Sequence, residues 1–216
     1  MNKYITDLYE AFNNVCEEFY CTESVRQPEA FFDGRIPKTT FIQQTELQFS
    51  AELYSEWRQI IKIEKDDYHN LKIGFEVSKK FIDNIYIKDQ ESFRPDLILH
   101  QSQIDFNPDF QKIYIEVKAN HNLSTKKIMN DIKKIALAMT EYRFECGVFI
   151  CINCNIDRLK ILIAHAKIKI EKINKEEGTE TNLWENIYLI SGFNNHKRII
   201  KFSDINLPSH LIPFHL

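Results

Sequence analysis

The chain has 216 residues, of which 44% are hydrophobic and 27% are charged, and its formal net charge is −3 at pH 7. A chain of this length and apolar content can bury a full core, so we expect one main domain. The sequence shows no signal peptide, no apolar run long enough to span a membrane and, among its five glycines, no phosphate-binding loop. We therefore expect a cytoplasmic protein without an ATP-driven motor of its own.

The five cysteines agree with a reducing compartment, because an odd number in a chain without a signal peptide favours free thiols. Cys151 and Cys154 have the spacing of a zinc or redox motif, but Cys151 falls inside a predicted strand. A zinc site would need Cys16 and Cys21 as its second pair, and their separation is poor for that role. We expect no structural zinc.

The N-terminal segment, residues 1–20, has apolar residues at helical spacing: Ile5, Leu8, Phe12, Val15 and Phe19. Residues 21–38 contain two prolines and one glycine and are predicted to form a connecting loop. We divide the chain into a helical extension with its loop, residues 1–38, and a main domain, residues 39–216.

A long helix is predicted to start at Thr40, because the segment from Thr40 has the pattern of a capping box. Its apolar stripe is predicted to face a sheet: Phe49, Leu53, Trp57 and Ile60. Glu46 lies on this stripe, where a carboxylate is unexpected unless a cation is near. In the alternative interpretation the helix begins at Thr45, and Glu46 is a first-turn residue favoured by the helix dipole. Both interpretations stay open at this point.

Three strand patterns follow this helix: Leu71–Val77, Phe93–His100 and Lys112–Asn120. In the third, isoleucine and valine alternate with Lys112, Tyr114, Glu116 and Lys118. A turn at residues 107–109 is predicted to join the second and third strands into a hairpin. If this hairpin folds about position 106, residues whose numbers sum to 212 face each other, and Asp96 lies opposite Glu116.

The facing of Asp96 and Glu116 is the most informative feature of the sequence. Opposed carboxylates destabilise a sheet, and a divalent cation between their hard oxygen ligands relieves the repulsion. Lys118 lies one pleat further along the same face, close enough to reach a phosphate or an attacking water. The non-functional alternative is that Asp96 caps a strand end, while Glu116 and Lys118 form a solvated face.

A second helix is predicted from Ser124 to Tyr142 by an apolar stripe of isoleucine, methionine and tyrosine. Its other faces are basic, with Lys126, Lys127, Lys133 and Lys134. Because the whole chain is mildly acidic, this positive charge is local, and it suits contacts with a phosphate backbone. A solvated helix face is the alternative.

The C-terminal part continues the alternation of strands and helices. The predicted elements are a central apolar strand at 147–152, a helix from Asn155 or Asp157 to Lys172, a loop at 175–182, and strands at 187–190 and 198–202. The helical segment is ambiguous, because its apolar residues also alternate as in a strand. The order of elements predicts an α/β fold with helices on both faces of a mixed sheet.

Pro95-Asp96 together with Glu116-Val117-Lys118 resembles the motif of the PD-(D/E)xK nuclease superfamily. The resemblance extends over roughly Phe41 to Asn153 and implies a restriction-endonuclease-like three-layer sandwich, with a mixed β-sheet flanked by helices. It also implies a site for Mg²⁺, or Mn²⁺ in its place, with Asp96, Glu116, the carbonyl of Val117 and Glu46 as ligands. The catalytic residues implied are Asp96, Glu116, Lys118 and Glu46.

The function implied by this resemblance is that of a metal-dependent phosphodiesterase, an endonuclease that cleaves DNA in restriction, another form of defence, or repair. RNA stays open as a substrate, and a homodimer or a larger nuclease complex is compatible with the assignment. Lys126, Lys127, Lys133 and Lys134 are the nucleic-acid-binding candidates. The rival interpretation is a catalytically inactive nucleic-acid-binding or assembly subunit on the same fold.

Overall fold

The computed structural model describes residues 2–19, 38–75, 95–101, 108–120, 122–176, 183–193 and 196–206. The helices are α1 (Lys3–Asn14), α4 (Lys38–Ile63), α5 (Thr125–Thr140) and α6 (Ile156–Glu176). The strands are β1 (Leu71–Phe75), β2 (Leu97–Gln101), β3 (Gln111–Lys118), β4 (Cys146–Ile152), β5 (Ile187–Phe193) and β6 (His196–Lys201). Short 3-10 turns lie at Glu17–Phe19, Pro108–Phe110, Trp184–Asn186 and Phe202–Asp204.

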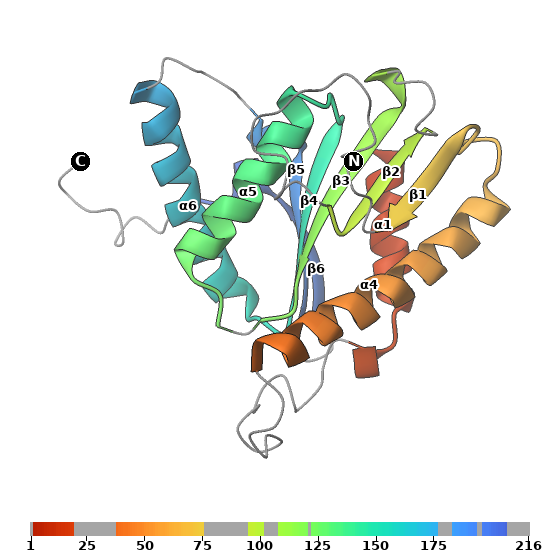
Figure 1. The fold of residues 1–216 in the computed structure, drawn as a ribbon, viewed down its shortest axis with the longest axis horizontal. Coiled ribbons are helices and arrows are strands. Elements are labelled where there is room, and N and C mark those ends of the chain that lie inside the picture. The colour runs from red at the N-terminus through yellow and green to blue at the C-terminus, as the bar shows by residue number, and fades with distance from the viewer. Residues whose placement is uncertain are drawn as a thin grey trace.

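The six strands form one mixed sheet in the order β1-β2-β3-β4-β5-β6. β3, β4 and β5 are parallel to one another, and α5 and α6 make the two connections between them. β2 is antiparallel to both of its neighbours, and β6 is antiparallel to β5. The carboxyl ends of β3 and β4 point to the lower edge of the molecule in Figure 1, so residues that end these strands are gathered there.

The predicted hairpin register is confirmed where β2 and β3 pair. Leu97 faces Ile115, Ile98 faces Tyr114 and Leu99 faces Ile113, before the register shifts at His100. The strand itself is shorter than predicted, because β2 begins at Leu97 and Asp96 lies just before it. Phe93 and Arg94, which were included in the predicted strand, fall outside the described residues.

Helices cover both faces of the sheet (Figure 1). One core packs α1 and α4 against the face that includes Ile113, Ile115 and Val117. The predicted stripe of α4 lies in this core, with Phe49, Leu53, Trp57 and Ile60 all buried. The second core packs α5 and α6 against the opposite face, where Tyr114 and Phe149 lie. The expectation of a mixed sheet with helices on both faces is therefore confirmed.

The second core corrects the sequence interpretation of β3. The alternating pattern indicated a half-buried strand, whereas β3 is buried or nearly buried along its whole length. The face with Tyr114 and Glu116 lies beneath α5, because Tyr114 shares a core with Ile128 and Ile132. α5 also lies close over β4, since a Cβ on Gly147 would come within 2.1 Å of Ile135 Cγ2.

Two helix starts agree with those predicted from the sequence, and a third does not. Ser124 caps α5, and its side chain accepts a hydrogen bond from the N–H of Lys127. The ambiguous segment after β4 is helix α6, and the Asn155 side chain accepts from the first main-chain N–H groups of that helix. By contrast, α4 begins at Lys38, so both predicted starts, Thr40 and Thr45, are wrong.

The first helix is tied to the last strand. Nζ of Lys197 on β6 donates hydrogen bonds of 3.0, 2.8 and 2.9 Å to the carbonyls of Phe12, Asn13 and Val15 at the end of α1. These carbonyls are among the groups that a helix end leaves without an internal partner.

In the described part of the chain we find no helix with both the length and the apolar character needed to cross a membrane.

Candidate active site

The predicted site residues meet at the carboxyl end of β3. This strand supplies Glu116 and Lys118, and Asp96 comes from the segment that enters the neighbouring strand β2. Oδ2 of Asp96 accepts a hydrogen bond of 2.6 Å from the main-chain N–H of Val117. The carboxylate of Asp96 is therefore fixed to the strand that carries Glu116, as the predicted pairing requires.

Glu46 reaches the same strand end from α4. Its Oε1 accepts a hydrogen bond of 2.9 Å from the main-chain N–H of Ala119. Because α4 begins at Lys38, Glu46 lies well inside the helix, and no acidic residue lies in the first turn. The alternative in which Glu46 is a first-turn residue favoured by the helix dipole is thus wrong.

Two carboxylates and two ammonium groups form a closed ring between β3 and α5. Oε2 of Glu116 lies 3.8 Å from Nζ of Lys118 and 3.5 Å from Nζ of Lys134. Oδ1 of Asp131 lies 3.8 Å from Nζ of Lys118 and 3.6 Å from Nζ of Lys134. The side chain of Glu116 is only 1% exposed and that of Lys118 is 21% exposed. The alternative of a solvated face is therefore wrong for Glu116.

Sequence analysis did not assign Asp131 and Tyr114 to the site. Asp131 is a buried carboxylate on the apolar side of α5, next to the buried Ile132. A charged residue inside an apolar stripe was the available signal, the same signal that singled out Glu46. Tyr114 lies two residues before Glu116 on the same strand face, and its hydroxyl donates a hydrogen bond of 2.6 Å to Oε1 of Glu116. Glu116 is thus held through both of its oxygens.

The four carboxyl groups share one electrostatic feature, which is that the charged form is disfavoured. Burial, and next the negative charge of Asp96, raise the pKa of Glu116 to about 7. Burial is also the largest cause that raises the pKa of Asp96, Glu46 and Asp131 above their ordinary values. Burial lowers the pKa of Lys118, but four carboxylates, Asp131 first, raise it above its ordinary value.

The charges of the cluster fit a divalent cation. Four carboxylates, on Glu46, Asp96, Glu116 and Asp131, stand against two ammonium groups, so the fully ionised cluster carries a net charge of −2. Carboxylate and carbonyl oxygens are the ligands that Mg²⁺ prefers. The donor set and the excess charge therefore match the metal that the sequence motif implies.

The side chains do not close around an ion as they stand. Within the described residues, no three His, Cys, Asp or Glu side chains come together as a group that could hold a metal. The ammonium groups of Lys118 and Lys134 lie against Glu116 and Asp131, whereas Asp96 and Glu46 accept hydrogen bonds from main-chain N–H groups. Nζ of Lys118 donates a hydrogen bond of 3.0 Å to the carbonyl oxygen of Val117, the expected main-chain ligand.

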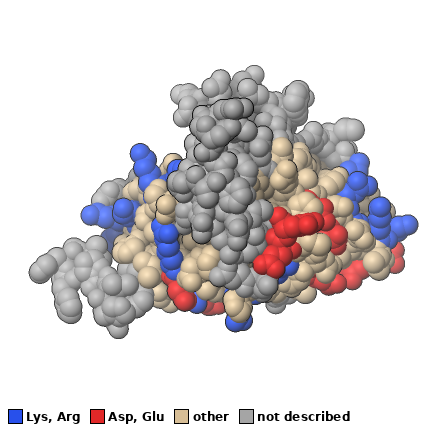
Figure 2. Space-filling model, turned by 90° about the horizontal axis from the view of Figure 1, so that it is seen from below, with Lys and Arg blue, Asp and Glu red and all other residues tan. Residues whose placement is uncertain are grey.

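The four α5 lysines predicted to bind nucleic acid fall into two groups. Lys126, Lys127 and Lys133 are exposed. Lys134 instead turns inward and pairs with Glu116 and Asp131. Figure 2 views the molecule toward the edge at which β3 ends, and most of the Lys and Arg side chains coloured there lie toward the two sides of the view.

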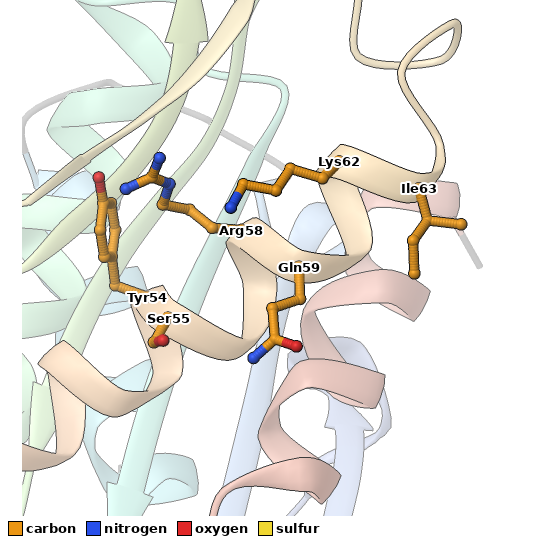
Figure 3. A pocket seen from close by; sticks show the side chains of 6 residues that line it. All are labelled: Tyr54, Ser55, Arg58, Gln59, Lys62 and Ile63. Carbon is orange, nitrogen blue, oxygen red and sulfur yellow. The ribbon is translucent and has the colours of Figure 1, made fainter.

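A hollow of about 530 Å³ lies along the last turns of α4 (Figure 3). The described residues that line it are Tyr54, Ser55, Arg58, Gln59, Lys62 and Ile63. The guanidinium of Arg58 lies over the ring of Tyr54, 5.5 Å from its centroid. None of the charged residues of the β3 cluster is among these lining residues, so the hollow and the cluster are separate features.

Comparison with known proteins gives no relative for this chain. No protein-family model matches the sequence, and neither the curated proteins nor the solved structures contain a significant match. Any assignment of function therefore depends on the cluster at the end of β3 and on the short motif that led to it.

Proposed function

We propose that this protein is a metal-dependent phosphodiesterase, an endonuclease that cleaves DNA with a site of the PD-(D/E)xK kind. The observation that carries the proposal is the meeting of Asp96, Glu116 and Lys118 with Glu46 at one strand end, in a cluster whose ionised charge is −2. Buried carboxylates with raised pKa values are costly to keep ionised unless a cation accompanies them. A metal-binding nuclease site would account for the presence of such carboxylates at this strand end.

The residues that would hold the metal are Asp96, Glu116, Glu46 and the carbonyl of Val117, with Mg²⁺ or Mn²⁺ as the ion. When bound, such an ion lowers the pKa of a coordinated water and stabilises negative charge on the scissile phosphate. Hydrogen bonds within the protein already hold the carboxylate ligands in place. Asp96 and Glu46 are held by main-chain N–H groups, and Glu116 is held by the Tyr114 hydroxyl.

Lys118 is the residue suited to act on the reacting groups. Its ammonium group lies within 3.8 Å of carboxylate oxygens of both Glu116 and Asp131, so it stays charged at neutral pH. A fixed cation beside the carboxylates orients an attacking water and offsets the charge that develops on the phosphate. Because its position is set before substrate arrives, little reorganisation is needed during the reaction.

The exposed lysines of α5 are proposed to contact the DNA backbone. Lys126, Lys127 and Lys133 follow the site in sequence and point outward from the helix that covers it. Cations in such positions neutralise phosphates without reading bases. The mixed sheet between helix layers agrees with a restriction-endonuclease-like three-layer sandwich. A role in restriction, other defence or repair would follow from that resemblance.

The test is cleavage of supercoiled plasmid by the purified protein with Mg²⁺ or Mn²⁺, and with EDTA in their place. We expect nicked or linear DNA only with metal. Lys118→Ala should lower the rate by about 10²-fold or more, on the scale of one lost preorganised charge, while circular dichroism shows an intact fold. Lack of metal-dependent cleavage of plasmid and of a single-stranded RNA substrate tested in parallel would refute the proposal.

A second candidate function is a binding or assembly subunit that does not cleave. The observation that favours it is that Lys118 and Lys134 already neutralise Glu116 and Asp131 without an ion. A gel-shift assay separates the two functions. Metal-independent binding of DNA, together with an absence of product in the plasmid assay, would support the second candidate.

A further inference from the structure

The strongest unexplained feature of the site is the position of Lys134. Its side chain is 30% exposed, yet its ammonium group is directed into the cluster, 3.5 Å from Glu116 Oε2 and 3.6 Å from Asp131 Oδ1. Its neighbour Lys133 is exposed. Burial raises the pKa of Asp96, and the positive charges of Lys118 and, more weakly, Lys134 oppose this shift.

A divalent cation on Glu116 would meet this ammonium group. A carboxylate oxygen that binds Mg²⁺ lies about 2 Å from the ion. Oε2 of Glu116 is already within 3.8 Å of two ammonium nitrogens. An ion on that oxygen would lie close to two positive charges in a poorly solvated setting, where repulsion is strong. Lys134 and the ion are therefore competitors for Glu116 in the present arrangement.

Asp131 is placed to resolve this conflict. Its carboxylate is buried, contacts both ammonium groups through Oδ1, and stands on the same helix as Lys134, three residues earlier. A lysine released from Glu116 can keep its pairing with Asp131 without leaving the helix surface. Because both residues lie on α5, this ion pair does not depend on the position of the sheet.

We infer that Lys134 is a built-in counter-ion that competes with the divalent cation for Glu116, and that Asp131 is the positioning residue that retains its ammonium group once the ion binds. The inference rests on the proposed metal-dependent function and deepens it. Lys134 would thereby control the occupancy of the site by the ion. Its presence would raise the metal concentration that is needed to fill the site.

The test is calorimetric titration of Mn²⁺ and Mg²⁺ into the metal-free protein without DNA, at roughly physiological ionic strength. Lys134→Gln should bind the ion about tenfold more tightly than the wild type, because one nearby positive charge is removed. Lys133→Gln is the matched control, since it removes the same charge from the adjacent exposed position and should leave the affinity unchanged. Equal affinities for these two variants would overturn the inference.

A double-mutant cycle then tests the role of Asp131. Asp131→Asn should weaken ion binding in the wild-type background, and the loss should shrink when Lys134→Gln is also present, because the retained ammonium group is gone. Losses that simply add would overturn the positioning role. Failure of the proposed function looks different, since a well-folded wild type would then bind no ion, whereas failure of the inference alone leaves wild-type binding that Asp96→Asn weakens.

Discussion

The main-chain N–H of Val117 donates a hydrogen bond of 2.6 Å to Oδ2 of Asp96, so the carboxylate that precedes β2 is held by the strand that carries Glu116. The donor belongs to the backbone, and its position is set by the pairing of β3 with its neighbours. Asp96 is therefore placed by the sheet before any ion arrives. The same logic applies to Glu46, which is held by the N–H of Ala119.

The first prediction concerns Asp96. Asp96→Asn keeps an oxygen that can accept from Val117 but removes one negative charge from the cluster. We expect weaker binding of Mg²⁺, together with a higher melting temperature in EDTA, because burial disfavours the charged form of Asp96. Calorimetry and thermal melts measure the two effects, with the exposed Asp66→Asn as the control. Ion affinity equal to that of the wild type would remove Asp96 from the ligand set.

The second prediction concerns pH and stability without metal. The pKa of Glu116 is raised in the folded protein from an ordinary value of 4.5 to about 7. A raised carboxyl pKa means that the folded state binds the proton more tightly, so its contribution to stability is present below the unfolded pKa and is lost as pH rises through the folded pKa. The metal-free protein should lose on the order of 3 kcal/mol of unfolding free energy between about pH 4.5 and pH 7.

Urea unfolding in EDTA across this pH range measures that loss. The raised pKa values of Asp96, Glu46 and Asp131 act in the same direction. Glu116→Gln should flatten the dependence and leave the part that these three residues contribute. Stability that instead increases with pH across this window would contradict the assigned direction.

The third prediction concerns Glu46. Glu46→Gln retains an acceptor for the N–H of Ala119, so the melting temperature in EDTA should stay near that of the wild type or rise slightly. Loss of the charge should lower plasmid cleavage and move the magnesium optimum to higher concentration. A magnesium titration of activity checks this, with a melt on the same preparation. An unchanged optimum would mean that Glu46 only anchors the end of β3 to α4.

The fourth prediction concerns the exposed lysines of α5. Each phosphate neutralised contributes about 0.9 to the slope of log affinity against log salt. Replacing Lys126 and Lys133 with Gln should therefore flatten the slope by up to about two such units. The same pair of changes at Lys169 and Lys172, which are exposed on α6, is the control and should leave the slope as it was. Equal slopes for both pairs would move the DNA path away from α5.

The site was predictable where local pattern and pairing geometry determine it. Alternation along β3, combined with a turn signal, was enough to derive the register that aligns Leu97 with Ile115 and brings Asp96 to Glu116. Ser124 was recognised as the start of α5 because an N-cap is a local interaction. These features depend on residues that are neighbours in sequence or across one hairpin.

The rest depends on how separate elements pack, which local pattern does not encode. Alternation cannot distinguish a solvated strand face from one covered by a helix, so the burial of Glu116 beneath α5 was missed. For the same reason Lys134 was grouped with the outward lysines, although it pairs with a strand residue. The start of α4 at Lys38 also preceded the strongest local cap signal, at Thr40.

The three hydrogen bonds from Lys197 to the end of α1 have a consequence for the order of folding. The donor and the Phe12 carbonyl are 185 residues apart in the chain, so the end of α1 is completed only when β6, a strand distant in sequence, lies beside it. Contacts of such long range are formed late and slow the search for the native state. We thus expect α1 to be among the last elements to become protected from solvent exchange, and α1 and β6 should gain that protection together.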